Sequence, residues 1–144
     1  MSFQIALSGL NAASTDLQIT SNNIANANTI GFKKSRGEFA DVFSGDAVGI
    51  GNGVRLTDVR QEFTQGNVEA SNNPLDIAIN GGGFFRTTSA GIAQYSRNGQ
   101  FSLDKDGFMV NAQGAKLTGY GVGPSGDVLP GTPVPSHINA ADLH

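Results

Sequence analysis

Apolar residues recur with a helical period from residue 3 to residue 24 of the chain. Large side chains and serines alternate there at steps of four and three positions, which places them along one side of a helix. A stripe this narrow is typical of the seam between two packed helices, because a helix that covers a broad core carries a wider stripe. The pattern predicts a helix whose seam faces a partner helix. The seam residues are Phe3, Leu7, Leu10, Ser14, Leu17, Ser21 and Ile24.

This helix is expected to depend on neighbouring molecules for its order. Gly9 and several Ser, Thr and Asn residues weaken its helix propensity. Helices not much longer than about 12–15 residues are marginal alone in water. Burial of a large seam residue would stabilise the helix by roughly 1.5–3 kcal/mol for each side chain. We therefore predict that packing between subunits gives the helix its shape.

Asparagines crowd the stretch that follows the seam. Asn side chains compete for backbone hydrogen bonds and tolerate left-handed geometry, so they suit a helix that is ending. Glycine then supplies a permissive backbone position. We interpret the stretch as a helix end that can also orient the helix. Its marked residues are Asn22, Asn23, Asn26, Gly31 and Phe32.

The middle of the chain predicts an extended arm. The spacing of the glycines between residues 44 and 53 superficially resembles a phosphate-binding loop. A dinucleotide-binding fingerprint must open a helix, whereas residues 54–59 alternate like a strand, so a flexible linker or loop is the better interpretation. Alternating residues at 54–59 and 61–64 lead to Gly66-Asn67 and then to 68–70, a pattern that predicts a β-hairpin.

Short alternating segments separated by turn residues fill most of the remaining chain. Strands are predicted at 75–79 and on both sides of Asn98-Gly99 and Asp106-Gly107, dipeptides that suit tight hairpins. Prolines after residue 123 rule out a regular central strand there. The predicted fold class is mainly β with an N-terminal α-helix. Four segments are expected: an assembly helix at 1–30, an extended linker and β-hairpin arm at 31–73, a compact domain of short antiparallel strands at 74–122, and a Pro/Gly-rich linker to an absent outer domain at 123–144.

Composition narrows the possible partners. The 144 residues carry a net charge of −3 and only 15% charged side chains, so no strong field favours nucleic acid or an acidic membrane. The basic cluster at 33–36 is too small for a nucleic-acid surface and predicts a solvated face. Cysteine is absent, which excludes disulfides and thiolate metal sites. The N-terminus lacks a basic leader followed by an apolar run, so a cleaved secretion signal is not expected.

Candidate chemistry is weak throughout the sequence. Asp104 and Asp106 lack the remaining ligands of a calcium loop and the cleft that a glycosidase pair needs, so a hairpin turn is the better interpretation. His137 and His144 have no metal-site or triad spacing. Ser8 lacks the strand-turn-helix context of a nucleophile elbow. The sequence predicts no catalytic residue, cofactor or metal site.

Three runs of residues resemble the flagellar rod and hook family. They are Ser8–Ala12 with Asn22–Asn26 and Thr29–Lys33, Leu75–Ile79 with Gly83–Phe85, and Tyr95–Phe101. The runs at 39–43, 61–66 and 117–120 look more like hook members of that family than rod members.

The resemblance implies a structural subunit of an extracellular helical tube, the flexible hook, with no enzymatic activity and no cofactor. It implies export through the flagellar type III apparatus without a cleaved signal. The implied partners are copies of itself, neighbouring rod, cap and hook–filament junction proteins and the export apparatus, with no nucleic acid and no small-molecule substrate. In that family the N-terminal helix pairs with a C-terminal helix. No second heptad follows residue 27, so an N-terminal fragment of a longer protein is expected.

Two alternatives remain at this point. A rod subunit of the same family would carry nearly the same fold-bearing residues. A glycan-binding β module would need a concave aromatic site, whereas this chain has no Trp and only Tyr95 and Tyr120 as tyrosines.

Overall fold

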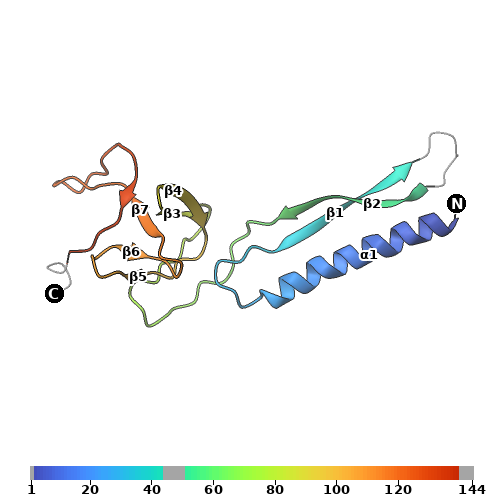
Figure 1. Ribbon diagram of the computed structural model, residues 1–144, viewed down its shortest axis with the longest axis horizontal. Helices are drawn as coiled ribbons and strands as arrows, with labels where there is room; N and C mark the ends of the chain where they lie inside the picture. The colour runs from blue at the N-terminus through green and yellow to red at the C-terminus, as the bar shows by residue number, and fades with distance from the viewer. Residues whose placement is uncertain (1, 44–50, 140–144) are drawn as a thin grey trace. The chain divides into compact units, whose positions relative to one another are not determined.

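The computed structural model describes residues 2–43 and 51–139. They fall into two compact units, residues 1–64 (unit 1) and residues 65–144 (unit 2), and each is described by itself (Figure 1). His144 and the part of the predicted linker from 44 to 50 lie outside the described residues.

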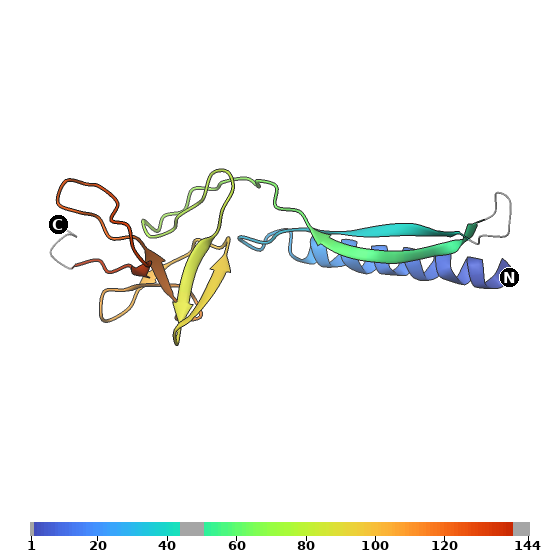
Figure 2. The ribbon, with the colours of Figure 1, turned by 90° about the horizontal axis from the view of Figure 1, so that it is seen from above.

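Unit 1 consists of a helix and a hairpin. Helix α1 spans Ser2–Ala25, which confirms the predicted helix. Strands β1 (Ser35–Phe43) and β2 (Gly51–Gln61) pair antiparallel in a two-stranded sheet. This sheet lies along the length of α1, as both ribbon views show (Figures 1 and 2). The helix therefore has a packing partner within its own chain.

The hairpin uses only one of the strands that the sequence predicts, because the predicted strand at 54–59 lies within β2. Residues 62–84 contain no strand, so the predicted turn at Gly66-Asn67 is wrong. Strand β2 pairs with β1 instead. The sequence did not predict strand β1, because charged residues interrupt the alternation of apolar and polar side chains there. In the structure they are accommodated by ion pairs, since Glu38 lies 3.6 Å from Arg60 across the hairpin and 3.5 Å from Arg36.

Unit 2 is an antiparallel sheet of short strands, which confirms the predicted fold class. The strand order is β4-β3-β7-β6-β5, with β8 paired to β7. Its strands are β3 (Phe85–Ser89), β4 (Ile92–Ser96), β5 (Ser102–Leu103), β6 (Met109–Val110), β7 (Lys116–Gly119) and β8 (Val134–Pro135).

The predicted turns of unit 2 are partly correct. Gly107, with φ at 84°, closes the turn between β5 and β6, and Asp104 Oδ1 accepts the N–H groups of Asp106 and Phe108 there. The hairpin predicted at Asn98-Gly99 is wrong, because β4 and β5 lie at the two ends of the strand order. Gly99 instead accepts the Ile77 N–H at 2.9 Å.

The strand predicted at 75–79 is also wrong. Asn73 turns the chain there: its backbone oxygen accepts the Asp76 N–H at 3.1 Å, and its side-chain oxygen accepts the Leu75 N–H at 3.2 Å. The apolar side chain of Leu75 packs against the core of unit 2 from this turn. The alternating apolar residues at 75–79 therefore include one that packs against the core, Leu75, although no strand forms there.

The core of unit 2 is small. Phe101, Met109 and Leu117 are buried together, and Phe85 packs its ring edge against Phe101 with the centroids 5.4 Å apart. Thr87 is also buried, and its hydroxyl has no hydrogen-bond partner among the described residues.

Arg97 fastens the residues that precede β3. Its guanidinium donates to the carbonyl oxygens of Ile79, Gly81 and Gly83 and to the side-chain oxygen of Gln65. One half-buried side chain therefore holds a stretch that has no strand of its own.

The tail contributes to the sheet, a pairing that the predicted linker did not anticipate. Strand β8 pairs with β7, and the Ser136 N–H donates to the Leu117 carbonyl at 2.8 Å. Pro135 is tolerated because β8 is a short outer strand, where a missing N–H costs little.

Candidate assembly surface

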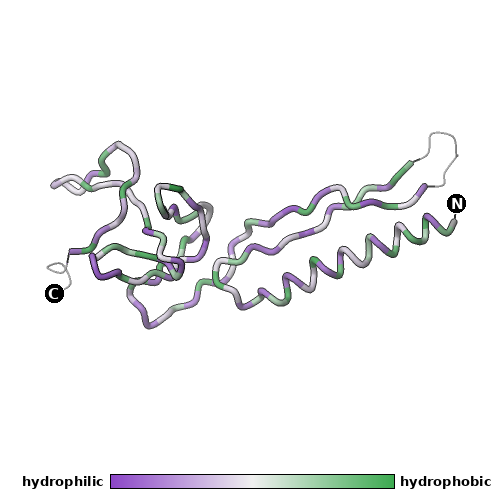
Figure 3. The backbone as a smooth tube through the Cα atoms, viewed as in Figure 1, coloured by the Kyte–Doolittle hydropathy of each residue, from purple (hydrophilic) through white to green (hydrophobic). Residues whose placement is uncertain are grey.

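The predicted seam lies on the exposed side of α1. Phe3 is 77% exposed, Leu10 67%, Leu17 68% and Ile24 70%, while Leu7 is 45% exposed. Ser14 and Ser21 are exposed between them. Figure 3 shows hydrophobic residues recurring along the helix among polar ones. The structure thus leaves the whole seam open, and the identity of the partner that covers it stays a prediction.

A second, less exposed row of α1 faces the hairpin. Each residue turns an α-helix by about 100°, so this row lies about 180° from the seam. It also keeps steps of three and four, which is the signal that the sequence prediction missed. The row consists of Ile5, Ser8, Ala12, Thr15, Ile19 and Asn23. The expectation that only other subunits pack against this helix is therefore wrong for one of its two faces.

Small residues let the helix and hairpin approach closely. A Cβ atom at Gly37 would lie 3.1 Å from the Ile19 side chain. Near the other end, Gly53 has φ at 109°, and a Cβ there would overlap the Ser8 hydroxyl. The Val54 N–H donates to that hydroxyl at 3.3 Å. Larger residues at either glycine would push the helix from the sheet.

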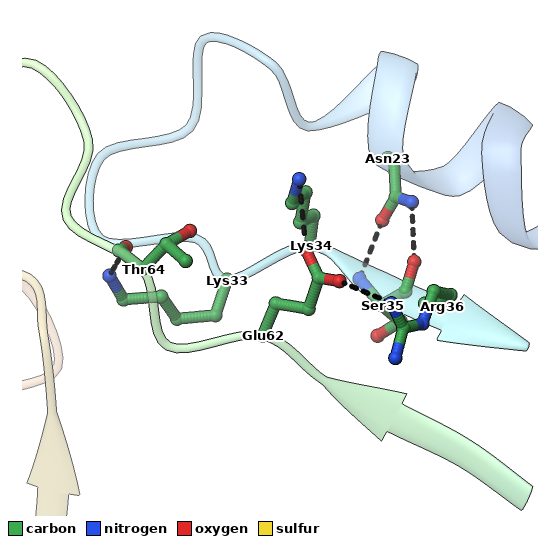
Figure 4. A network of polar contacts seen from close by, with 7 residues as sticks. All are labelled: Asn23, Lys33, Lys34, Ser35, Arg36, Glu62 and Thr64. Atoms are coloured by element: carbon green, nitrogen blue, oxygen red, sulfur yellow. Dashed lines mark hydrogen bonds and ion pairs between the residues drawn. The ribbon is translucent and has the colours of Figure 1, made fainter.

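Asn23 connects the end of α1 to the start of β1 (Figure 4). Its Nδ2 donates to the Ser35 carbonyl at 2.7 Å, and its Oδ1 accepts the Ser35 N–H at 2.9 Å. The Asn23 side-chain amide thereby bonds to both the N–H and the carbonyl of Ser35, as the backbone of a neighbouring strand would. This supports the interpretation that the asparagine stretch orients the helix.

The other marked residues shape the helix end. The Asn26 N–H and side-chain amide both donate to the Asn22 carbonyl, at 3.1 and 2.9 Å. Gly31 adopts φ at 77°, and the Phe32 N–H donates to the Thr29 carbonyl at 3.2 Å. These bonds satisfy groups that a terminating helix leaves unpaired.

The basic cluster forms ion pairs at the base of the hairpin (Figure 4). Lys34 Nζ lies 2.9 Å from Glu62, Arg36 lies 3.4 Å from the same carboxylate, and Lys33 donates to the Thr64 carbonyl at 2.7 Å. The hydrogen bond and charge of Lys34, followed by the charge of Arg36, hold the pKa of Glu62 below its ordinary value of 4.5. The lysine and arginine side chains stay mostly exposed, as predicted for a solvated face.

Neither a metal-binding cluster nor a membrane-spanning helix is found in the described part of the chain. No group of three metal-ligating side chains gathers among residues 2–43 and 51–139. His137 packs edge-on against Phe108, with its Nε2 3.0 Å from the Asp106 carbonyl oxygen. Within the same ranges, no helix is both long and apolar enough for a membrane span.

Comparison with known proteins places these features in a family. Residues 78–141 match the family described as flagellar hook protein FlgE/F/G D1 domain, and residues 3–33 match the flagella basal body rod protein family. The chain is 50% identical over 121 residues to the flagellar hook protein FlgE of Salmonella typhimurium. The chain belongs to the flagellar hook and rod protein family.

Two hook proteins of this family resemble the chain more than a rod protein does. The alignment with the Salmonella hook protein covers 83% of this chain and 30% of the relative, and the Escherichia coli hook protein shows the same identity and coverage. The flagellar basal-body rod protein FlgG of Agrobacterium fabrum is 38% identical over 128 residues, covering 76% of this chain and 49% of the relative. The chain therefore spans less than half the length of these hook and rod relatives, whose family is a structural component of the flagellum.

Proposed function

We propose that the chain is a structural subunit of the bacterial flagellar hook, which polymerises into a flexible extracellular tube that couples rod to filament. The 50% identity to the hook proteins of Salmonella typhimurium and Escherichia coli, against 38% to the FlgG rod protein of Agrobacterium fabrum, supports the hook assignment. The observation that carries the assembly role is the exposed seam of α1, because five large apolar side chains lie in one row away from the hairpin.

The seam acts as a helix–helix interface between chains or chain segments. Burying each of its large side chains would stabilise association by roughly 1.5–3 kcal/mol. Several such side chains are needed, because association costs at least about 4 kcal/mol in lost freedom of motion. Ser14 and Ser21 between them allow a partner helix to come close.

The two units then serve different purposes in the tube. Unit 1 forms the helical inner layer through its seam, while unit 2 makes shallow outer contacts through polar turns. Contacts with few buried apolar groups can shift between registers at small cost. A tight inner layer with sliding outer contacts is how the tube would bend.

The remaining parts of the proposal follow from the family. The protein is not an enzyme and uses no cofactor. Its partners are copies of itself, the adjoining rod, cap and hook–filament junction proteins, and the flagellar export apparatus, which exports it without a cleaved signal. The names of its relatives, hook protein and basal-body rod protein, support a place in the hook or basal body.

Complementation of a strain that lacks its hook protein tests the assignment. The gene that encodes this chain is expected to restore curved hooks, visible by electron microscopy, and swimming. The seam variant Leu17→Asp should abolish hooks. Ile92→Asp, at 67% exposure in unit 2 against 68% for Leu17, is the matched control and should retain them. Normal hooks from Leu17→Asp would refute the role of the seam.

A rod subunit is the second candidate, favoured by the match of residues 3–33 to the rod protein family. A rod subunit would leave the hook-deficient strain without hooks and would instead complement a rod-deficient strain. Deletion of residues 1–24 should abolish polymers of either kind while unit 2 stays folded.

A further inference from the structure

The chain contains three Asn-Gly dipeptides: Asn52-Gly53, Asn80-Gly81 and Asn98-Gly99. At Asn-Gly the backbone nitrogen of glycine can attack the asparagine side chain, because glycine has no Cβ to obstruct the approach. The attack requires the backbone to rotate around both residues. The folded chain gives the three pairs very different freedom to do so.

Asn98-Gly99 is locked in place. Gly99 is buried, a Cβ atom there would overlap the Ile77 carbonyl oxygen, and Gly99 accepts the Ile77 N–H at 2.9 Å. Asn98 Oδ1 is occupied by the Gln100 N–H at 2.9 Å. Neither reacting group can leave its position without breaking these contacts.

Asn52-Gly53 is held by the helix. Both residues belong to strand β2. Gly53 sits with φ at 109° against α1, where a Cβ atom would overlap the Ser8 hydroxyl and lie 3.7 Å from Ile5 Cα. Rotation of this backbone would collide with the helix.

Asn80-Gly81 is open. Asn80 and the three glycines that follow it are exposed, and a Cβ atom added at Gly81, Gly82 or Gly83 would meet no atom within 4 Å. Among the described residues, neither the Asn80 side chain nor the Gly81 N–H takes part in a hydrogen bond. Arg97 does hold the carbonyl oxygens of residues 79, 81 and 83, so the feature that distinguishes this pair is the open space around Gly81, in contrast to the contacts at Gly53 and Gly99.

We propose that Asn80 is a site of spontaneous deamidation, selected by the fold over Asn52 and Asn98. The Gly81 nitrogen loses its proton to solvent base and bonds to Asn80 Cγ, and Nδ2 leaves as ammonia, which closes a succinimide ring. Water then opens either C–N bond of the ring, giving aspartate or isoaspartate. The net change is gain of water and loss of ammonia, with no oxidant or reductant.

The product changes the contacts of Arg97. A carboxylate appears within the stretch that its guanidinium holds, and isoaspartate also adds a methylene to the backbone between two of its acceptors, the carbonyls of Ile79 and Gly81. The spacing of those acceptors then no longer fits one guanidinium. Deamidation therefore loosens the residues that precede β3.

Peptide mapping of the whole folded chain tests the proposal. Trypsin separates the three pairs, because they fall in the peptides 37–55, 61–86 and 98–105. After incubation in warm, mildly alkaline buffer, mass spectrometry should find the amide-to-acid mass increase at residue 80 several-fold faster than at residues 52 or 98. Isoaspartyl methyltransferase with a labelled methyl donor should label the peptide 61–86.

Two controls make the result decisive. The chain kept in denaturant should react at all three sites with similar rates, because the fold then protects none of them. Asn80→Gln, which lengthens the side chain and disfavours ring closure, should remove the modification at position 80. Equal rates at the three sites in the folded chain, or an unmodified Asn80 beside a reactive denatured chain, would overturn the proposal.

Discussion

Phe101 and Leu117 of unit 2 are 3% and 9% exposed, whereas Phe3 and Leu17 of unit 1 are 77% and 68% exposed. No described residue of unit 1 is fully buried, although its helix and hairpin extend farther than any element of unit 2. Unit 2 encloses a small core of Phe101, Met109 and Leu117 within short strands and turns.

The difference shows two ways of using apolar residues. Unit 2 gathers some of its apolar side chains into a buried core, although others, such as Ile92 and Tyr95, stay exposed. Unit 1 is a helix on a two-stranded sheet, and two layers this thin cannot enclose a core. Its apolar residues remain available for other chains. The following variants test this contrast, and the signals can be separated because both tyrosines, Tyr95 and Tyr120, lie in unit 2 while α1 supplies the helical circular dichroism.

The largest effect is expected for Phe101→Ala. Truncation of this buried ring should destabilise unit 2 by about 3–5 kcal/mol, through lost burial and a cavity. Denaturant unfolding followed by tyrosine fluorescence measures it. The matched variant Leu17→Ala should change the stability of unit 1 by less than about 0.5 kcal/mol, since the side chain is exposed. Equal losses would break the contrast between the units.

Asn23→Ala should loosen unit 1 alone. The Ser35 N–H and carbonyl lose both partners, at a cost of about 1–3 kcal/mol. The helical signal should melt earlier while the tyrosine signal stays unchanged. Asn22→Ala is the control, because among residues 2–43 and 51–139 the Asn22 side chain makes only a 3.5 Å contact, with Asn26. If both variants behave alike, Asn23 does not connect helix to hairpin.

Thr87→Val should stabilise unit 2. The Thr87 hydroxyl is buried without a partner among the described residues, and a methyl group of similar shape removes that penalty. We expect a gain of about 1 kcal/mol in the free energy of unfolding. Thr88→Val at a half-buried neighbouring position should gain less. A loss of stability in Thr87→Val would show that the hydroxyl is satisfied in solution.

The smallest effect is expected when the pH is lowered. Lys34 and Arg36 lower the pKa of Glu62 in the folded chain, so the carboxylate binds its proton more readily when unfolded. The stabilisation is fully present above the ordinary value of 4.5 and is lost as the pH falls through the lower folded value. The helical melting temperature should fall over this range, and Glu62→Gln should flatten the change. A pH response unaltered in Glu62→Gln would assign it to other carboxylates.

The sequence predicted the helix and its seam because residues 3–24 repeat regularly over several turns. It could not show that Ile5 and Ile19 form a second row, since the larger seam residues dominated the pattern. The sequence did not predict strand β1, because its charged residues are accommodated by ion pairs that form only in the folded hairpin.

Turn residues were a reliable guide only where the turn was local. Asp104 and Gly107 bond to each other within one turn, and the sequence indicated that turn correctly. Position 99 needs glycine because a Cβ atom there would overlap the carbonyl oxygen of Ile77, which lies far away in sequence. The Asn98-Gly99 dipeptide therefore reflects this close contact and not the hairpin turn that it suggested.

The pairing of α1 with its own hairpin has a consequence for the approach of partners. A bare helix can be surrounded on all sides, whereas the hairpin half-covers one row of this helix, from Ile5 to Asn23, and leaves its other sides exposed. A further helix can therefore pack on the exposed sides but not on the row that faces the hairpin. The hairpin thus restricts where a helical partner can approach before any neighbour arrives.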